Sequence, residues 1–220
     1  MWVYYWSDTW LPNEHTLAYY PLNSTTTVND LSGNNKNLTN AWNVTFWTNY
    51  WVNCAYFNWT QNGMLVQNNI SFNAYPTYTA SVRMYITTNS AYNTIYVIGS
   101  VMETGALWSW YKRGTWLSLS WWSPNWEVIK SWNIDWWWHL LTNVVNWSNA
   151  IQYLDWQQYQ TLTNLLSGTQ TVLCLWVPAN FHQDNVLTWS LSNFILEDKV
   201  RTAQDVADYY DKIKSQYWIS

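Results

Sequence analysis

Apolar and polar residues alternate along many short stretches of this 220-residue chain. The clearest stretch is 76–87, in which every second position is apolar: Tyr78, Ala80, Val82, Met84 and Ile86. Such alternation places the apolar side chains on one face of a strand. Similar stretches predict further strands at 16–22, 52–58, 64–67, 94–98, 117–121, 127–130, 138–145, 150–154, 171–175 and 187–197. Many short strands at close spacing favour an antiparallel sandwich or barrel.

Near the C-terminus the apolar period changes from two residues to about 3.6. Val206, Tyr210, Ile213 and Tyr217 form one apolar stripe at helical spacing. Thr202 fits the N-cap position, and Asp205 three residues later resembles the acidic partner of a capping box. The pattern predicts one short helix at about 202–217, which we expect to pack on the edge of the sandwich.

Tryptophan and glycine occur in unusual numbers, with 22 tryptophans and six glycines. Trp59, Trp147 and Trp156 each follow Asn or Asp after a strand-like stretch, where a hairpin turn commonly has glycine. A positive φ suits glycine, whereas a bulky side chain in that conformation is an outlier. We therefore favour the hypothesis that many tryptophans are glycine codons, UGA, read with the wrong genetic code. The alternative is a tryptophan-rich surface that stacks on sugars.

Four parts of the sequence carry a family resemblance in their order and spacing. They are 17–23 (LAYYPLN) with 30–34 (DLSGN), 55–59 (AYFNW), 138–141 (WHLL) with 146–147 (NW) and 153–156 (YLDW), and 191–196 (LSNFIL) with 201–206 (RTAQDV). Together they resemble the LamG-like jelly roll of the concanavalin A-like lectin/glucanase superfamily. Trp138 falls where that family has tryptophan, whereas Trp59, Trp147 and Trp156 fall where it has glycine.

This resemblance implies an all-β, two-sheet antiparallel jelly-roll sandwich with one short C-terminal helix. The sandwich would span 16–220, after an N-terminal extension at 1–15. Family members often carry sugar- or protein-binding loops at one edge, and some bind calcium.

Two groups of residues are candidate binding sites. In a predicted loop region at 89–114, aromatic and charged side chains suit sugar faces and hydroxyls: Tyr92, Tyr111, Lys112 and Arg113. The alternative is a flexible loop in which Trp108 and Trp110 are misread glycines. Asp30, Ser32 and Asn34 offer oxygen ligands at alternate positions, which calcium accepts. The alternative there is a turn whose side chains bond the local backbone, and we expect no other cofactor.

The sequence predicts no catalytic site. Glucanases of the superfamily carry an E-x-D-x-x-E strand, and retaining hydrolysis needs two carboxyl groups about 5–5.5 Å apart. That triplet is absent, and the adjacent Glu197 and Asp198 would point to opposite faces of a strand.

Charge and hydropathy exclude several other functions. The net charge is −4 without a basic stripe, so nucleic acid is not an expected partner. No apolar run reaches 18 residues, and residues 1–13 lack the pattern of a secretory signal. Cys54 and Cys174 both lie in apolar stretches. We expect buried free thiols, and the alternative is a disulfide between them.

These observations predict a non-catalytic recognition module that binds a cell-surface glycan or a partner protein. We expect an extracellular or virion-associated setting, such as a phage tail or capsid decoration. The alternative is a purely structural domain of a particle, and a glycoside hydrolase is the third possibility.

Overall fold

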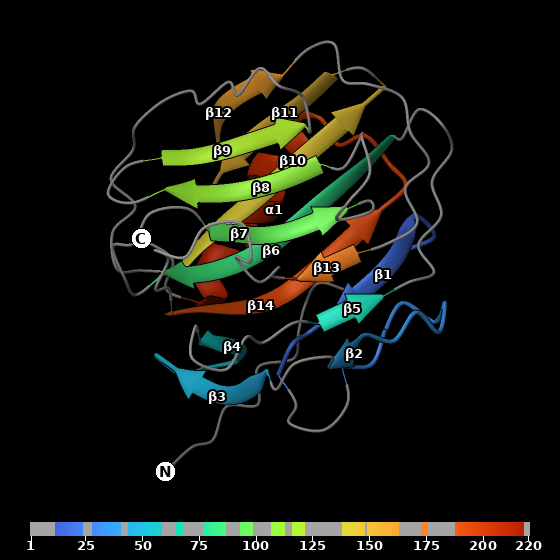
Figure 1. The fold of residues 1–220 in the computed structure, drawn as a ribbon. Coiled ribbons are helices and arrows are strands. Elements are labelled where there is room, and N and C mark those ends of the chain that lie inside the picture. Colours follow the sequence, from blue (N-terminus) through green and yellow to red (C-terminus); the bar gives the residue numbers. More distant parts are fainter. Residues whose placement is uncertain are drawn as a thin grey trace.

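The computed structural model describes residues 12–23, 28–40, 44–58, 65–67, 77–86, 93–98, 107–112, 116–121, 138–147, 149–162, 173–175 and 188–217. Within these ranges the chain forms two antiparallel sheets that pack face to face, with one helix outside them (Figure 1). The fold is a two-sheet jelly-roll sandwich with a C-terminal helix, as the sequence predicts. Among the described residues, no helix is both long and apolar enough to cross a bilayer.

The larger sheet has eight strands in the order β12-β11-β10-β6-β14-β4-β3, and β1 also pairs with β14. Their bounds are β1 Thr16–Tyr20, β3 Thr45–Asn49, β4 Val52–Asn58, β6 Thr77–Ile86, β10 Trp138–Asn146, β11 Asn149–Leu154, β12 Gln157–Leu162 and β14 Thr188–Glu197. The smaller sheet has six strands in the order β2-β5-β13-β7-β8-β9. These are β2 Thr39–Asn40, β5 Leu65–Gln67, β7 Asn93–Ile98, β8 Leu107–Lys112, β9 Trp116–Trp121 and β13 Leu173–Leu175.

Alternate residues of β6 face the core between the two sheets and the outer face of the larger sheet. Its inward side chains, at Tyr78, Ala80, Val82 and Met84, join the core between the sheets, together with residues of the smaller sheet such as Leu65, Ile95 and Leu173. The intervening side chains lie on the opposite face of the larger sheet. Three of these intervening residues, Thr79, Ser81 and Arg83, are polar, so the apolar core positions alternate with polar ones along β6.

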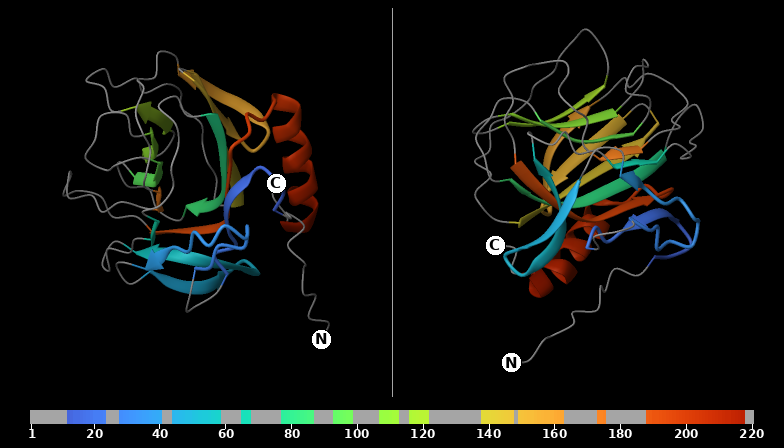
Figure 2. Two further views of the ribbon diagram at one scale, coloured as in Figure 1. Left: turned by 90° about the vertical axis from the view of Figure 1, so that its right-hand side faces the viewer. Right: turned by 60° about the horizontal axis from the view of Figure 1, so that its bottom comes forward.

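Helix α1 (Ala203–Tyr217) covers that opposite face, so the domain has three layers (Figure 2). Tyr210 and Ile213 pack with Val52, Tyr85 and Leu140 of the larger sheet. Val206 packs separately with Val144 and Tyr153. The predicted helix is confirmed, but its predicted place on the sandwich edge is wrong. Its apolar stripe buries more surface against the centre of a sheet than an edge strand could offer.

Cys54 lies in the layer beneath α1 as a buried free thiol. Burial raises the pKa of this thiol, which therefore stays protonated at neutral pH. The free-thiol interpretation is confirmed for Cys54, whereas the side chain of Cys174 lies outside the described residues.

The sequence pattern did not reveal β2, β3, β8 or β12. β3 and β12 are the two ends of the larger sheet's strand order, and their side chains are largely exposed. An edge strand of this kind has little apolar periodicity to detect. The predicted strand at 127–130 lies outside the described residues.

Three two-residue hairpin loops show where the chain needs a positive φ. Tyr50 and Trp51 join β3 to β4 with φ of 45° and 68°. Trp147 begins the β10–β11 loop with φ of 58°. In the β11–β12 loop the positive φ of 58° belongs to Asp155 and not to Trp156. The predicted positive φ is therefore found at Trp147 but not at Trp156. Trp51 also has a positive φ, which the sequence did not predict. Trp59 lies outside the described residues.

Candidate functional site

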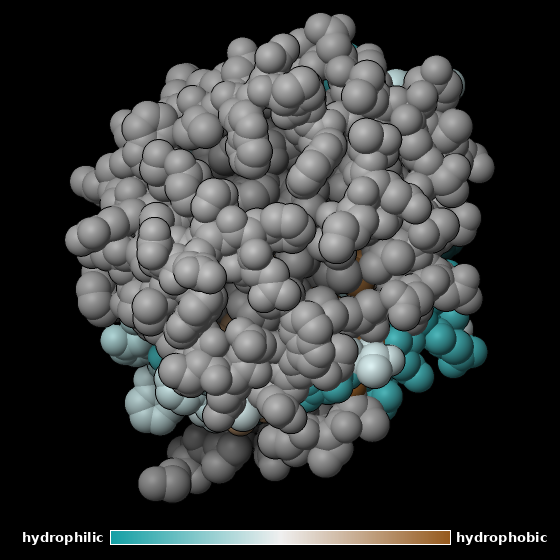
Figure 3. Space-filling model, viewed as in Figure 1, coloured by the Kyte–Doolittle hydropathy of each residue, from teal (hydrophilic) through white to brown (hydrophobic). Residues whose placement is uncertain are grey.

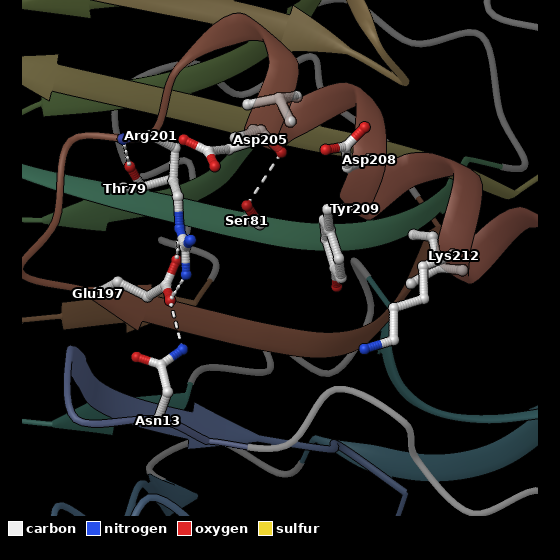
Figure 4. A pocket seen from close by; sticks show the side chains of 12 residues that line it. Asn13, Thr79, Ser81, Glu197, Arg201, Asp205, Asp208, Tyr209 and Lys212 are labelled. Atoms are coloured by element: carbon white, nitrogen blue, oxygen red, sulfur yellow. Dashed lines mark hydrogen bonds and ion pairs between the residues drawn. The ribbon is translucent and has the colours of Figure 1, made fainter.

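A pocket of about 280 Å³ lies between α1 and the outer face of the larger sheet. Figure 4 shows its lining from the side, with the strands below and behind the helix. The lining comes from three strands, the β14–α1 connection, the helix and the N-terminal segment: Asn13, Thr79, Ser81, Thr142, Glu197, Arg201, Asp205, Val206, Asp208, Tyr209, Lys212 and Ile213. None of these twelve residues is a tryptophan or a glycine, so the pocket is the same under either reading of UGA.

The floor of the pocket is a set of buried hydroxyl groups from β6 and β10. Ser81 and Thr142 are paired across the two strands, and their side-chain oxygens lie 2.9 Å apart. Two hydroxyl groups bonded to each other use only one of their two hydrogens. The second hydroxyl hydrogen of the pair is not used in this bond.

The neighbouring hydroxyl of Thr79 has a structural task. It donates to the carbonyl of Lys199 at 2.7 Å and accepts the backbone N–H of Arg201 at 3.1 Å. These two bonds fix the chain between β14 and α1, and so they fix the first turn of the helix over the sheet.

Glu197, which is 1% exposed, closes one end of the pocket. Arg201 Nε donates to Oε2 at 2.8 Å and Arg201 Nη2 donates to Oε1, which also accepts from Asn13 Nδ2 at 3.1 Å. Hydrogen bonding to Glu197 raises the pKa of Arg201, so the guanidinium is permanently charged. Both carboxylate oxygens are thus engaged, and Glu197 holds Arg201 and Asn13 at this end of the pocket.

The same bonds connect the N-terminal segment to the sandwich. Asn13 reaches Glu197, and His15 Nδ1 lies 3.1 Å from Asp198 Oδ1. Residues 13 and 15, within the predicted N-terminal extension, therefore contact the end of β14.

The opposite wall of the pocket belongs to α1. Val206 and Ile213 are buried and apolar, Tyr209 is half-buried, and Asp208 and Lys212 are exposed. Figure 4 shows Tyr209 and Lys212 extending from the helix in the same direction. The pocket thus combines an aromatic ring and aliphatic carbon with hydroxyl, carboxylate and ammonium groups.

The N-terminus of α1 is fixed by a reciprocal cap at the rim of the pocket. Thr202 Oγ1 accepts the N–H of Asp205 at 3.1 Å, while Asp205 Oδ2 accepts the Thr202 N–H at 2.8 Å and its hydroxyl at 2.9 Å. Bonds from the backbone and the hydroxyl of Thr202 lower the pKa of Asp205. The predicted capping arrangement is confirmed.

We expect Thr202→Ala to lower the free energy of unfolding by about 1 kcal/mol, the usual cost of losing an N-cap. Thr202→Ser, which keeps the hydroxyl, should stay close to the parent in urea denaturation. Because the pKa of Asp205 is lowered by folding, the contribution of the cap is present at neutral pH and is lost as the pH falls through that pKa. Equal midpoints for the Ala and Ser variants at pH 7 would contradict this role.

The predicted sugar-binding residues lie away from this pocket, in the smaller sheet. Tyr111 and Lys112 are in β8, paired with Leu117 and Trp116 of β9. Within the predicted loop region at 89–114, the strand predicted at 94–98 is confirmed as β7. The loop prediction is wrong for β8, where backbone pairing with β7 and β9 overrides the turn-like composition. The side chains of Tyr111 and Lys112, and the whole of Tyr92 and Arg113, lie outside the described residues, so their role stays a prediction.

The predicted calcium ligands form a compact turn after β1. Asp30 Oδ1 accepts the N–H groups of Tyr19 and Ser32, both at 2.9 Å, and Oδ2 accepts the N–H of Lys36 at 3.0 Å. Asn34 Nδ2 donates to the carbonyl of Thr16 at 2.8 Å. Gly33 has a φ of 91°, which this turn needs. The described bonds are those of the local turn, and calcium binding here remains a prediction.

This turn belongs to a polar part of the surface. On the face seen in Figure 3, hydrophilic residues gather at the lower right, where Figure 1 shows β2 and the chain leading into it. Among the described residues, no three His, Cys, Asp or Glu side chains gather closely enough to hold a metal ion.

Sequence reasoning missed the pocket because its residues carry no motif. Thr79, Ser81 and Thr142 are polar positions of strands whose outer face would normally meet solvent. The only signal was the apolar stripe of the C-terminal helix, which requires a sheet face to cover. A prediction that this helix covers the outer face of the larger sheet would have placed the three hydroxyl groups beneath it.

Known proteins resemble this chain in fold but share little of its sequence. No protein-family model matches the chain, and no curated protein matches it. Among solved structures, the binding domain of Paraclostridial Mosquitocidal Protein 1 is similar with a TM-score of 0.73 and 14% identity, over 90% of this chain and 52% of that one.

Two botulinum neurotoxin structures are similar with slightly lower TM-scores. One is of type C, whose cell entry depends on interaction with two ganglioside molecules, with a TM-score of 0.69 and 13% identity over 90% of this chain and 51% of that one. The other is the binding domain of type DC in complex with rat synaptotagmin II. Its TM-score is 0.69 and its identity 15%, over 92% of this chain and 52% of that one. The chain thus spans about half the length of these structures, which share its fold.

Proposed function

We propose that this chain is a non-catalytic recognition module that binds a cell-surface glycan or a surface protein. The observation that carries the proposal is the engagement of Glu197. The buried carboxylate of the pocket is held on both oxygens by Arg201 and Asn13, while hydroxyl, aromatic and aliphatic groups line the space around it. Such a pocket offers polar and apolar contacts for binding, and its buried carboxylate is occupied by Arg201 and Asn13.

The comparisons support this proposal through the fold. Two of the similar structures are described as binding domains, one of them bound to synaptotagmin II, and the type C neurotoxin interacts with gangliosides. Fold does not fix function, so a glycan or protein partner for this chain is a proposal by analogy. The assignment to LamG-like, concanavalin A-like domains, with an extracellular or virion-associated setting, is part of the same proposal.

We expect the protein to release no reducing sugar from β-glucans. Hydrolysis with retention needs two carboxyl groups about 5–5.5 Å apart, and Glu197 is engaged by a cation instead. The measurement is a reducing-sugar assay on soluble β-glucans. Activity that disappears in Glu197→Gln, with the variant still folded, would restore the enzyme interpretation.

The experiment that tests recognition combines a glycan array with a particle pull-down. Saturable binding to a defined glycan would support the recognition module. Stoichiometric incorporation into a particle with no glycan or surface-protein binding would favour a purely structural domain and overturn the proposal.

We also propose that many of the tryptophans replace glycine at UGA codons. Trp51 supports this most directly, because it is 97% exposed and has a φ of 68° in a two-residue hairpin loop. Trp147 is 60% exposed and has a φ of 58°. A mostly exposed indole gains less burial energy to offset the strain of these conformations than a buried one would.

A further inference from the structure

We propose that the pocket beneath α1 binds a single ring of a neutral sugar. This inference rests on the proposed function and names the site and the ligand class. The pocket volume of about 280 Å³ is near the lower limit of ligand sites, roughly 300 Å³. A site of this size accommodates one ring and leaves the rest of a glycan outside.

The charges that line the pocket favour a neutral ligand. Arg201 and Lys212 supply two positive charges, against three negative charges from Glu197, Asp205 and Asp208. The Arg201–Glu197 pair compensates itself, and Asp205 serves the helix cap. No excess positive charge remains to select a phosphate or a sugar acid, and the chain as a whole carries a net charge of −4.

The two sides of the pocket match the two faces of a sugar ring. Tyr209, Val206 and Ile213 offer an aromatic ring and aliphatic carbon to the C–H face of the sugar. The Ser81–Thr142 pair on the floor offers one O–H donor, and its oxygens accept hydroxyl hydrogens. Asp208 and Lys212 are exposed at the opening, where polar groups can bond the outer hydroxyls.

The site is also preformed. Thr79 fixes the entry of α1, Glu197 fixes Arg201, and Val206 and Ile213 anchor the helix on the sheet. A ligand therefore enters between elements that are already held in place, which lowers the entropic cost of binding.

Calorimetry on the whole chain tests the site, with neutral monosaccharides and any glycan that an array identifies. Tyr209→Ala and Thr142→Val should each weaken binding by about tenfold, because the first removes the aromatic wall and the second removes a floor hydroxyl at nearly constant volume. Asp211→Ala is the matched control, since Asp211 is exposed on α1 and does not line the pocket. Thermal melts check that each variant is folded, and Thr142→Val serves alone if Tyr209→Ala unfolds.

The outcomes separate this inference from the proposed function. Unchanged affinity in folded Tyr209→Ala and Thr142→Val would overturn the pocket while leaving recognition intact, most clearly if Tyr111→Ala weakened binding instead. Selective binding of acidic sugars would overturn the neutral ligand class. No binding to any glycan or surface protein would overturn the proposed function and the pocket with it.

Discussion

Replacing Trp51 and Trp147 with glycine should raise the free energy of unfolding by about 1–2 kcal/mol at each position. Both residues have a positive φ in a hairpin loop, and both indoles are more than half exposed. Glycine adopts this conformation without strain. Because the two loops belong to different hairpins, the two gains should be nearly additive in urea denaturation of the single and double variants.

Trp138→Gly is the matched control. Trp138 is 2% exposed, packs 5.7 Å from the ring of Tyr85 and lies beneath the guanidinium of Arg83. Its replacement should cost at least about 3 kcal/mol, as expected for a large buried aromatic side chain. The coding DNA should have TGA (UGA in the mRNA) at Trp51 and Trp147 and TGG at Trp138. TGG at all three positions, or no gain from glycine, would contradict the misreading hypothesis.

Glu197→Gln should lower the free energy of unfolding by about 2 kcal/mol. The change removes the charge partner of Arg201 at a site where the carboxylate is 1% exposed and the guanidinium side chain 23%. The variant should also loosen the entry of α1, since Arg201 is held there by Glu197 and Thr79. Chemical denaturation measures the first effect, and amide hydrogen exchange in 201–206 measures the second.

Asp198→Asn provides the comparison at the next residue. Asp198 is about half exposed, and its carboxylate lies 3.1 Å from Nδ1 of the half-exposed His15. Its replacement should change the free energy of unfolding by less than about 0.5 kcal/mol. Equal effects of Glu197→Gln and Asp198→Asn would contradict the structural role of Glu197.

The fold could be predicted wherever one face of an element is buried. β6 and α1 bury complete apolar faces, so their periods of two and 3.6 residues are visible in the sequence. β3 and β12 lie at the ends of a sheet and are largely exposed, which leaves little pattern to detect. Within the loop region predicted at 89–114, β7 was predicted as a strand at 94–98, but β8 was missed because its pairing with β7 and β9 depends on separate segments.

The turns illustrate what local sequence can and cannot give. Trp147 was recognised because Asn146 precedes it, although the loop begins one residue later than an Asn-Gly turn would. At Asp155 and Trp156 the loop is as expected, but the positive φ belongs to the aspartate. Trp51 carried no such signal, because its loop can be recognised only after β3 and β4 are seen to pair.

The pocket could not be predicted, because it depends on the layer in which α1 lies. Ser81 and Thr142 are far apart in sequence and meet through the pairing of β6 with β10. Tyr209 and Lys212 reach them only because the helix covers the face of the sheet. No spacing within any one segment encodes this arrangement.

The neutral-sugar site beneath α1 would place bound ligand next to the backbone of β6, β10 and the helix. The most direct test is a titration of isotope-labelled protein with an array-selected glycan, followed through backbone amide shifts. We predict saturable shifts at Ser81, Thr142 and residues 205–213, with the core strands β5 and β13 unchanged. Saturable shifts confined to the smaller sheet, or no saturable shift with any glycan, would contradict this site.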